Sequence, residues 1–161
     1  MAKQDAKVTI RRAVEADRAT LIKLIVRAYE DVRERQSGEV LARIWNDWKA
    51  NHVCSIDVDR VILAELAGKE VGFASYRVNA ATGIGIVDDN AVLPEYRGRG
   101  IGAQLLVRIL QLMEDAGMEF AQVSTGLEIS YMSARRMYER QGFVPLHRSV
   151  TYIKKLTQNA G

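Results

Sequence analysis

Arginine and glycine alternate at one place in the chain, in the run Arg97-Gly98-Arg99-Gly100-Ile101-Gly102. Apolar residues then recur at three- and four-residue steps, so the run is expected to open a helix. The first turn of a helix presents unpaired N–H groups and a partial positive charge. Glycine lets an oxyanion approach those groups without a side-chain clash, and arginine adds charged donors. The sequence therefore predicts a pyrophosphate-binding turn.

Two other phosphate motifs fit this turn less well. The lysine and Ser/Thr of a P-loop are absent. The run from Gly98 to Ala103 does match a dinucleotide fingerprint that ends in alanine. However, the strand expected at Phe120–Ser124 does not end on the acidic residue that would bind the ribose, and the motif stands late in the chain. A glycine turn that binds no ligand is the simplest alternative.

Composition favours a single globular domain over residues 1–161, since 48% of the 161 residues are hydrophobic and 27% are charged. No apolar run reaches the roughly 18 residues of a membrane helix, so no membrane partner is expected. The single cysteine, Cys54, excludes an internal disulfide, and no apolar signal core follows Met1; both favour a cytoplasmic setting. The net charge of +3 is dispersed, which favours a compact anion over nucleic acid as the ligand.

Hydrophobic periodicity predicts the elements that must position the turn. Strands are expected at residues 8–11, 60–66, 71–78, 85–92 and 120–124, with one or two more between 144 and 156. Helices are expected after a cap at Asp17, at residues 39–50, from Ile101 to a stop at Gly117, and at residues 133–141. Hairpins therefore come before a β-α-β crossover. The predicted fold class is α/β, with a mixed, mostly antiparallel central sheet flanked by helices.

A second motif follows the turn: Ala134, then Met137-Tyr138-Glu139-Arg140-Gln141-Gly142-Phe143. It resembles Ala-x-x-Leu-Tyr-Glu-x-x-Gly-Phe, while Arg97, Gly100 and Gly102 match Gln/Arg-x-x-Gly-x-Gly/Ala. Both are signatures of the GCN5-related N-acetyltransferase (GNAT) family, and the element order extends the resemblance over nearly the whole chain. It implies the acyl-CoA N-acyltransferase fold and acetyl transfer from acetyl-CoA, as co-substrate, to an amine.

The resemblance also assigns residues to the cofactor. Backbone groups of Ala91 and Val92 would hold the pantetheine arm, in a gap between the strands before and after the main helix, and polarise the thioester. The family often has asparagine seven residues before its tyrosine, but Tyr131 stands there, so a nearby hydroxyl would have to replace it. The cofactor-binding residues expected on this basis are Ala91, Val92, Arg97, Gly98, Arg99, Gly100, Ile101, Gly102, Ala103 and Ser133.

Acetyl transfer to an amine also requires proton transfers. The leaving thiolate needs a proton, and a tyrosine is protonated at neutral pH, so Tyr138 is the expected acid, although it could instead anchor its helix as a packed aromatic. A carboxylate could take the proton of the amine. Asp88 and Asp89 are expected to face opposite ways along a strand, and Glu128 follows a strand. The candidate catalytic residues are therefore Tyr138, Glu128 and Asp89.

Other chemistries find less support. His52 and Cys54 could form a covalent acyl-enzyme, but no third group orients them, and Cys54 suits an apolar filler. No ligand spacing links His52 and His147, so no metal site is expected. Tyr29, Trp45, Trp48 and Tyr76 could line an acceptor pocket, although helical spacing already explains the aromatic residues of the first two helices as core.

Three functions remain open at this stage. The first is acetylation of a small-molecule amine, the second is acetylation of a protein N-terminus or lysine, and the third is acyl-CoA sensing without turnover. An intact Tyr138 and a complete glycine turn favour catalysis. A homodimer is also open, because an unpaired terminal strand could support one.

Overall fold

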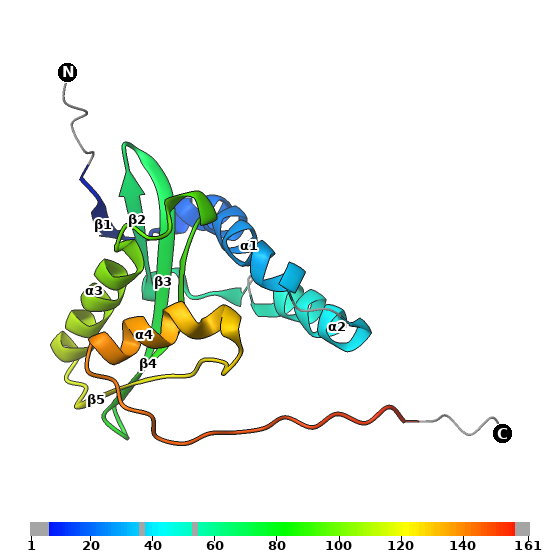
Figure 1. Cartoon of the computed structure of the whole chain (residues 1–161). Coiled ribbons are helices and arrows are strands. Elements are labelled where there is room, and N and C mark those ends of the chain that lie inside the picture. Colours follow the sequence, from blue (N-terminus) through cyan, green and yellow to red (C-terminus); the bar gives the residue numbers. More distant parts are fainter. Residues whose placement is uncertain (1–6, 36–37, 53–54, 157–161) are drawn as a thin grey trace.

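The computed structural model describes residues 7–35, 38–52 and 55–156 (Figure 1). One five-stranded sheet lies at its centre, with the strands in the order β1 to β5. Neighbouring strands from β1 to β4 pair antiparallel, whereas β4 and β5 pair parallel. The predicted mixed, mostly antiparallel sheet is confirmed. The strands are β1 (Thr9–Arg12), β2 (Val61–Leu66), β3 (Lys69–Asn79), β4 (Ile84–Val92) and β5 (Phe120–Val123).

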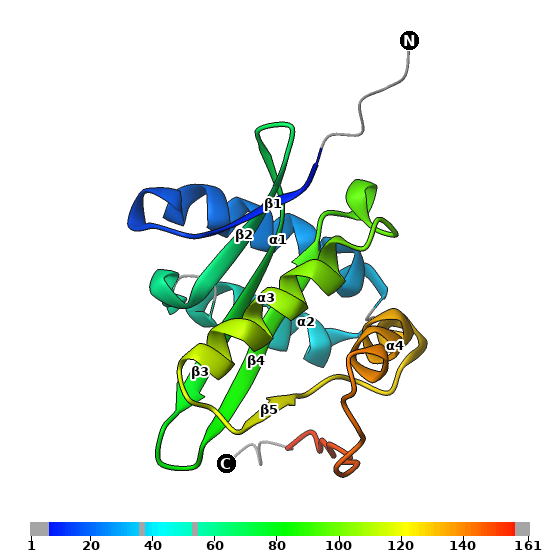
Figure 2. The ribbon, with the colours of Figure 1, turned by 90° about the vertical axis from the view of Figure 1, so that its left-hand side faces the viewer.

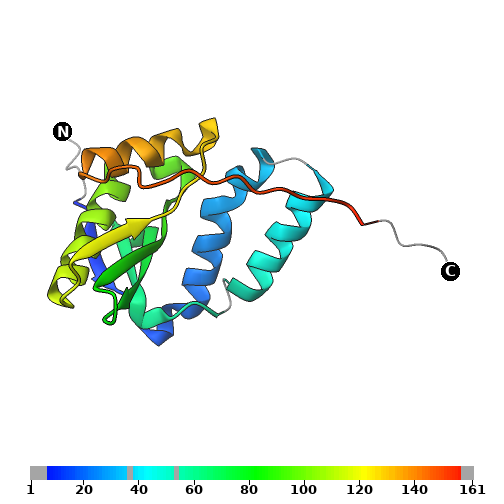
Figure 3. The same cartoon turned by 90° about the horizontal axis from the view of Figure 1, so that it is seen from below.

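Helices cover both faces of this sheet. Figure 2 shows α3 in front of the strands and α1 behind them, and Figure 3 shows α2 beside α1. A π-helical turn, η2 (Trp48–His52), continues α2 directly. The parallel pairing of β4 and β5 follows from α3, which carries the chain over the sheet between them. The helices are α1 (Arg18–Arg35), α2 (Glu39–Asp47), α3 (Ile101–Asp115) and α4 (Met132–Arg140).

The two layers have separate cores because alternate residues of the central strands face opposite sides. Ile62 and Ala64 of β2 join a cluster with α3, whereas Val61 and Leu63 of the same strand join a cluster with α1. Such double-sided burial explains why β2 is apolar at consecutive positions. The sheet therefore lies between a layer of α3 and α4 and a layer that contains α1.

A bulge bends β4 in its middle. Ser75 of β3 pairs with Asp89, but the next residue, Tyr76, pairs with Val87, so Asp88 has no partner in the register. The ladder between β4 and β5 ends close by, at Val87 and Val123, while β4 continues to Val92. The last residues of β4 therefore leave β5, in the region where the family resemblance implies that the pantetheine enters.

The expected C-terminal strands are a wrong prediction. Residues 144–156 belong to no strand, and Figure 1 shows them as extended chain running away from the sheet. Their apolar side chains are exposed, as for Tyr152 at 91%. A strand exists only through a ladder with a neighbour, which an alternating pattern cannot supply by itself. Pro145 also lacks an N–H group for such a ladder.

The boundaries of two helices also differ from the prediction. Asp17 does not cap α1; its carboxylate accepts bonds from the backbone N–H of Val14 and from Arg11, and so closes a short turn before the helix. The helix expected at residues 39–50 ends as α2 at Asp47, and its last turn widens into η2.

Candidate active site

The glycine turn forms a set of backbone donors at the start of α3. Gly98 and Gly100 both have φ of 74°, a left-handed conformation that favours glycine, and a Cβ atom at either would meet no atom within 4 Å. The first helical bond runs from the N–H of Gln104 to the carbonyl of Gly100, 3.1 Å. In the described part of the chain, the N–H groups from Gly98 through Ala103 donate to no acceptor. The turn therefore suits a pyrophosphate.

The two arginines of the turn differ in their contacts. The guanidinium of Arg97 donates to the carbonyl of Val92 at 2.9 Å and to the carbonyl of Ala28 in α1 at 2.8 Å. Arg99 lies over the ring of Tyr96, 5.4 Å from its centroid. The Arg97 side chain, which the sequence suggested as a donor to phosphate, thus ties the end of β4 to α1 across the sheet.

A cavity of about 990 Å³ extends from the turn along the gap between β4 and α4. Ala91 and Val92 line it from β4, and Tyr138 lines it from α4. Ser130, Tyr131 and Ser133 line it where the family often has asparagine. Since a chain of backbone donors opens into a long cavity with hydroxyl groups on its wall, the residues present fit a nucleotide with a pantetheine arm.

Tyr138 is nearly buried, with 9% of its surface exposed, and its ring packs against Phe143 at a centroid distance of 5.7 Å. Burial, and then the negative charge of Asp89, raise the pKa of the Tyr138 phenol above its usual value. The side chain is therefore protonated at neutral pH. It has both the contacts of a helix anchor and the protonation state of an acid.

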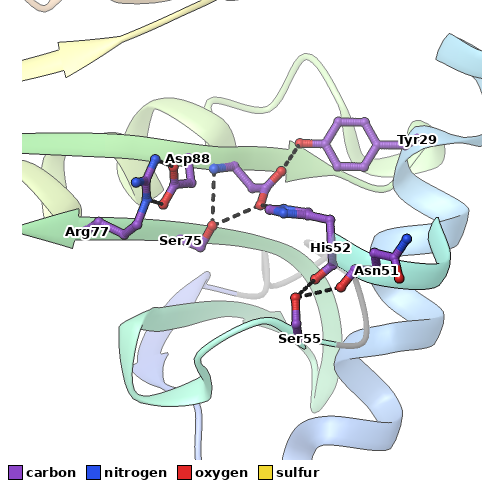
Figure 4. A network of polar contacts seen from close by, with 8 residues as sticks. Tyr29, Asn51, His52, Ser55, Ser75, Arg77 and Asp88 are labelled. Carbon is purple, nitrogen blue, oxygen red and sulfur yellow. Dashed lines mark hydrogen bonds and ion pairs between the residues drawn. The ribbon is translucent and has the colours of Figure 1, made fainter. Parts of the chain in front are cut away.

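Asp89 belongs to a network of polar contacts with Tyr29, His52 and Ser75, three residues that Figure 4 labels. Its Oδ1 accepts a bond from the Tyr29 hydroxyl at 3.1 Å, and its Oδ2 accepts one from the Ser75 hydroxyl at 3.0 Å. The Nε2 atom of His52 lies 3.1 Å from the same Oδ2. Burial and the adjacent carboxylate raise the pKa of Tyr29 well above its usual value, so this phenol remains a donor.

The other two carboxylates lie elsewhere. Asp88 lines the cavity but is paired with Arg77, at 2.7 Å for each of two bonds. Glu128 is exposed in the loop before α4 and is not among the described residues that line the cavity. Asp88 and Asp89 have different partners, Arg77 for the first and the hydroxyl groups of Tyr29 and Ser75 for the second, and the expectation that they face opposite ways along the strand stays a prediction.

Sequence reasoning missed the partners of Asp89. Tyr29, His52, Ser75 and Asp89 come from α1, η2, β3 and β4, so no local spacing connects them. A weak signal existed, because Ser75 interrupts an apolar run that the structure buries on both sides. His52 also continues the helical row of Trp45 and Trp48, and the rings of this row stack.

The geometry agrees with comparisons to known proteins. A model of the acetyltransferase (GNAT) domain matches residues 57–145, more than half of the chain. The chain belongs to the GNAT family. An uncharacterized N-acetyltransferase of Archaeoglobus fulgidus is 31% identical over 140 residues, which cover 82% of this chain and 90% of that protein.

Two further similarities extend the GNAT assignment. The aminoalkylphosphonate N-acetyltransferase of Salmonella typhimurium is 35% identical over 89 residues, 53% of this chain and 56% of that protein. The PaiA N-acetyltransferase of Thermoplasma acidophilum, solved with coenzyme A, has the same fold, with a TM-score of 0.70 at 17% identity over 84% of this chain and 88% of that one.

Membership of the family makes the chain an acetyltransferase with acetyl-CoA as its co-substrate. Within the described residues, no helix combines the length and the apolar character needed to cross a membrane.

Proposed function

We propose that this GNAT enzyme transfers the acetyl group of acetyl-CoA to a primary amine of a small molecule, by direct attack in a ternary complex. The observation that carries the proposal is the position of Tyr29. Tyr29 is one of the residues that line the donor cavity, and its hydroxyl donates to Asp89 in the polar network. An amine beside this network would thus meet the donor cavity at the bulge of β4.

In this proposal, the glycine turn and the end of β4 bind acetyl-CoA. The N–H groups from Gly98 to Ala103 bind the pyrophosphate, and Ser133 binds the pantetheine from α4. Ala91 and Val92 hold the arm where β4 has left β5. The N–H of Val92 stabilises the negative charge that forms on the carbonyl oxygen during attack. Tyr138 gives its proton to the sulfur as the C–S bond breaks.

The acceptor side combines a negative charge with aromatic walls. Tyr29 contacts the ring of Trp48 edge to face at 5.3 Å, and Trp48 stacks on Trp45 at 4.7 Å. A carboxylate beside aromatic faces is suited to a cationic amine. The relative that is named an aminoalkylphosphonate N-acetyltransferase supports a small acceptor. The match to that relative covers 53% of this chain.

The donor site is tested by calorimetric titration of acetyl-CoA into wild type, Gly100→Glu and Gly117→Glu proteins. Gly100 and Gly117 stand at opposite ends of α3, with φ of 74° and 77°, and neither has an atom within 4 Å of an added Cβ. The strain of the substitution is therefore matched. We expect Gly100→Glu to abolish binding, because its carboxylate repels phosphate, and Gly117→Glu to bind like wild type.

The acceptor class is tested by release of free coenzyme A with panels of small amines and of peptides that carry a free N-terminus or a lysine. Turnover of small amines supports the proposal. Turnover confined to peptides would replace it with protein acetylation, and tight acetyl-CoA binding without turnover on either panel would favour a sensor.

A further inference from the structure

The carboxylate of Asp89 is poorly placed to take a proton from an amine by itself. Its residue is 7% exposed, and its oxygens accept from the hydroxyl groups of Tyr29 and Ser75. A base must come within hydrogen-bond distance of the proton that it removes. Asp89 is therefore shielded from an acceptor that does not displace these neighbours.

His52 contacts Asp89 and is itself partly exposed to solvent. Its Nε2 lies 3.1 Å from Asp89 Oδ2, and 41% of its side chain is exposed. A carboxylate only accepts hydrogen bonds, so the Nε2 atom must carry the hydrogen. The neutral ring then has its lone pair on Nδ1. No hydrogen bond to Nδ1 occurs within residues 7–35, 38–52 and 55–156.

The π-helical turn η2 holds the His52 ring in this direction. Trp48 and His52 stand at its two ends, and their rings stack at 5.4 Å with an interplanar angle of 25°. The edge of Tyr29 in turn contacts Trp48. Such single turns of π-helix often occur at functional sites. The ring is therefore fixed by stacking on one side and by a carboxylate at one nitrogen.

We propose that His52 is the catalytic base, which removes a proton from the acceptor ammonium at Nδ1, and that Asp89 is a positioning residue that fixes the ring and its tautomer. This inference rests on the proposed amine acetylation and adds a residue that the family motifs do not include.

The ammonium gives one proton to His52 Nδ1, and the free amine forms a C–N bond with the acetyl carbon. The nitrogen loses its second proton as the C–S bond breaks. Tyr138 gives a proton to the thiolate and regains one from the nitrogen or from water, while His52 returns its proton to solvent. The products are the acetamide, free coenzyme A and one proton.

The kinetic test compares His52→Gln with His147→Gln. Glutamine keeps an N–H donor for Asp89 but has no basic nitrogen, and His147 lies in the exposed C-terminal stretch. With whichever amine the wild type accepts, small or peptide, we expect kcat of His52→Gln to fall about 10²- to 10⁴-fold. The dissociation constant of acetyl-CoA should not change, and His147→Gln should match wild type. Retention of kcat within about threefold would overturn the proposal.

A second measurement needs no acceptor and so separates this proposal from the proposed function. Long-range ¹H–¹⁵N NMR correlation of the histidine rings reports the tautomer. We expect the hydrogen of neutral His52 on Nε2 in wild type, and loss of that preference in Asp89→Asn, whose amide can also donate. A neutral His52 with its hydrogen on Nδ1 would overturn the proposal even if amine acetylation is confirmed.

Discussion

Tyr138 is a packing residue that also lines the donor cavity, where we propose that it acts as the acid. Its side chain belongs to the buried cluster between the helices and the sheet. The raised pKa that results from burial and from Asp89 keeps the proton in place well beyond neutral pH. As the proposed acid, Tyr138 would therefore carry its proton at the moment when the C–S bond breaks.

Replacement of Tyr138 by phenylalanine separates these two roles. Because phenylalanine keeps the ring contact with Phe143, we expect the thermal midpoint and the acetyl-CoA affinity to remain close to wild type. The loss of the proton donor should lower kcat about 100-fold or more. Steady-state kinetics checks this, with Tyr152→Phe in the exposed stretch as the control. An unchanged kcat would leave Tyr138 as a packing residue alone.

Single site residues can be predicted from the sequence where they stand close together along the chain. The glycine turn is predicted because its donors are consecutive residues, and Tyr138 stands in a short motif. The surroundings of Asp89 are not predictable in this way. Its partners His52 and Ser75 precede it by 37 and 14 positions, and only the fold brings them together.

Among the secondary-structure elements, α3 packs closely on β4. Gly85 faces Met113 of α3, and a Cβ atom at Gly85 would lie 2.6 Å from its sulfur and 2.8 Å from its Cγ. The absence of a side chain thus allows the helix to lie close to the strand. Since the same strand leads to the bulge and to the gap, this contact sets the position of the donor cavity relative to α3.

A double-mutant cycle tests that contact. We expect Gly85→Ala to lower the free energy of unfolding by about 1–3 kcal/mol through overpacking. Met113→Ala should lower it by about 2–5 kcal/mol through a cavity. The double variant should lose less than the sum, because the new methyl group enters the space that Met113 leaves. Urea unfolding measures all three. Additive losses would show that Met113 moves aside without cost.

The elements themselves were predicted to within a few residues, because their hydrophobic periods are local. The strands expected between residues 144 and 156 are a wrong prediction, because a strand also depends on a partner that is distant in the sequence. The stretch contains valine, leucine, isoleucine and tyrosine between polar residues, but this pattern does not specify which edge of the sheet it would join.

For the whole molecule, this stretch and β5 offer a means of association. The edge strand β5 pairs on one side with β4, and Val144, Leu146, Val150 and Tyr152 are exposed. Unpaired edges and exposed apolar residues favour pairing with another chain. The homodimer therefore stays a prediction with a specific surface.

Sedimentation velocity over a range of concentrations tests this surface. We expect wild type to dimerise and Val150→Lys/Tyr152→Lys to remain monomeric, because two charges would have to be buried in the new ladder. Wild type that sediments as a monomer at every concentration would contradict the prediction, and the stretch would then have to pair within its own chain or remain exposed.

The side chain of Arg97 connects the end of β4, beside the donor cavity, with α1, the helix that carries Tyr29. One guanidinium holds the carbonyl of Ala28, one residue before Tyr29 in α1, and the carbonyl of Val92 at the end of β4. If the turn next to Arg97 binds phosphate as proposed, we expect this binding to restrain α1, the helix that carries Tyr29. Linkage requires the effect to be mutual, so each substrate should raise the affinity of the other. The enzyme would then bind its two substrates cooperatively, whichever of them binds first.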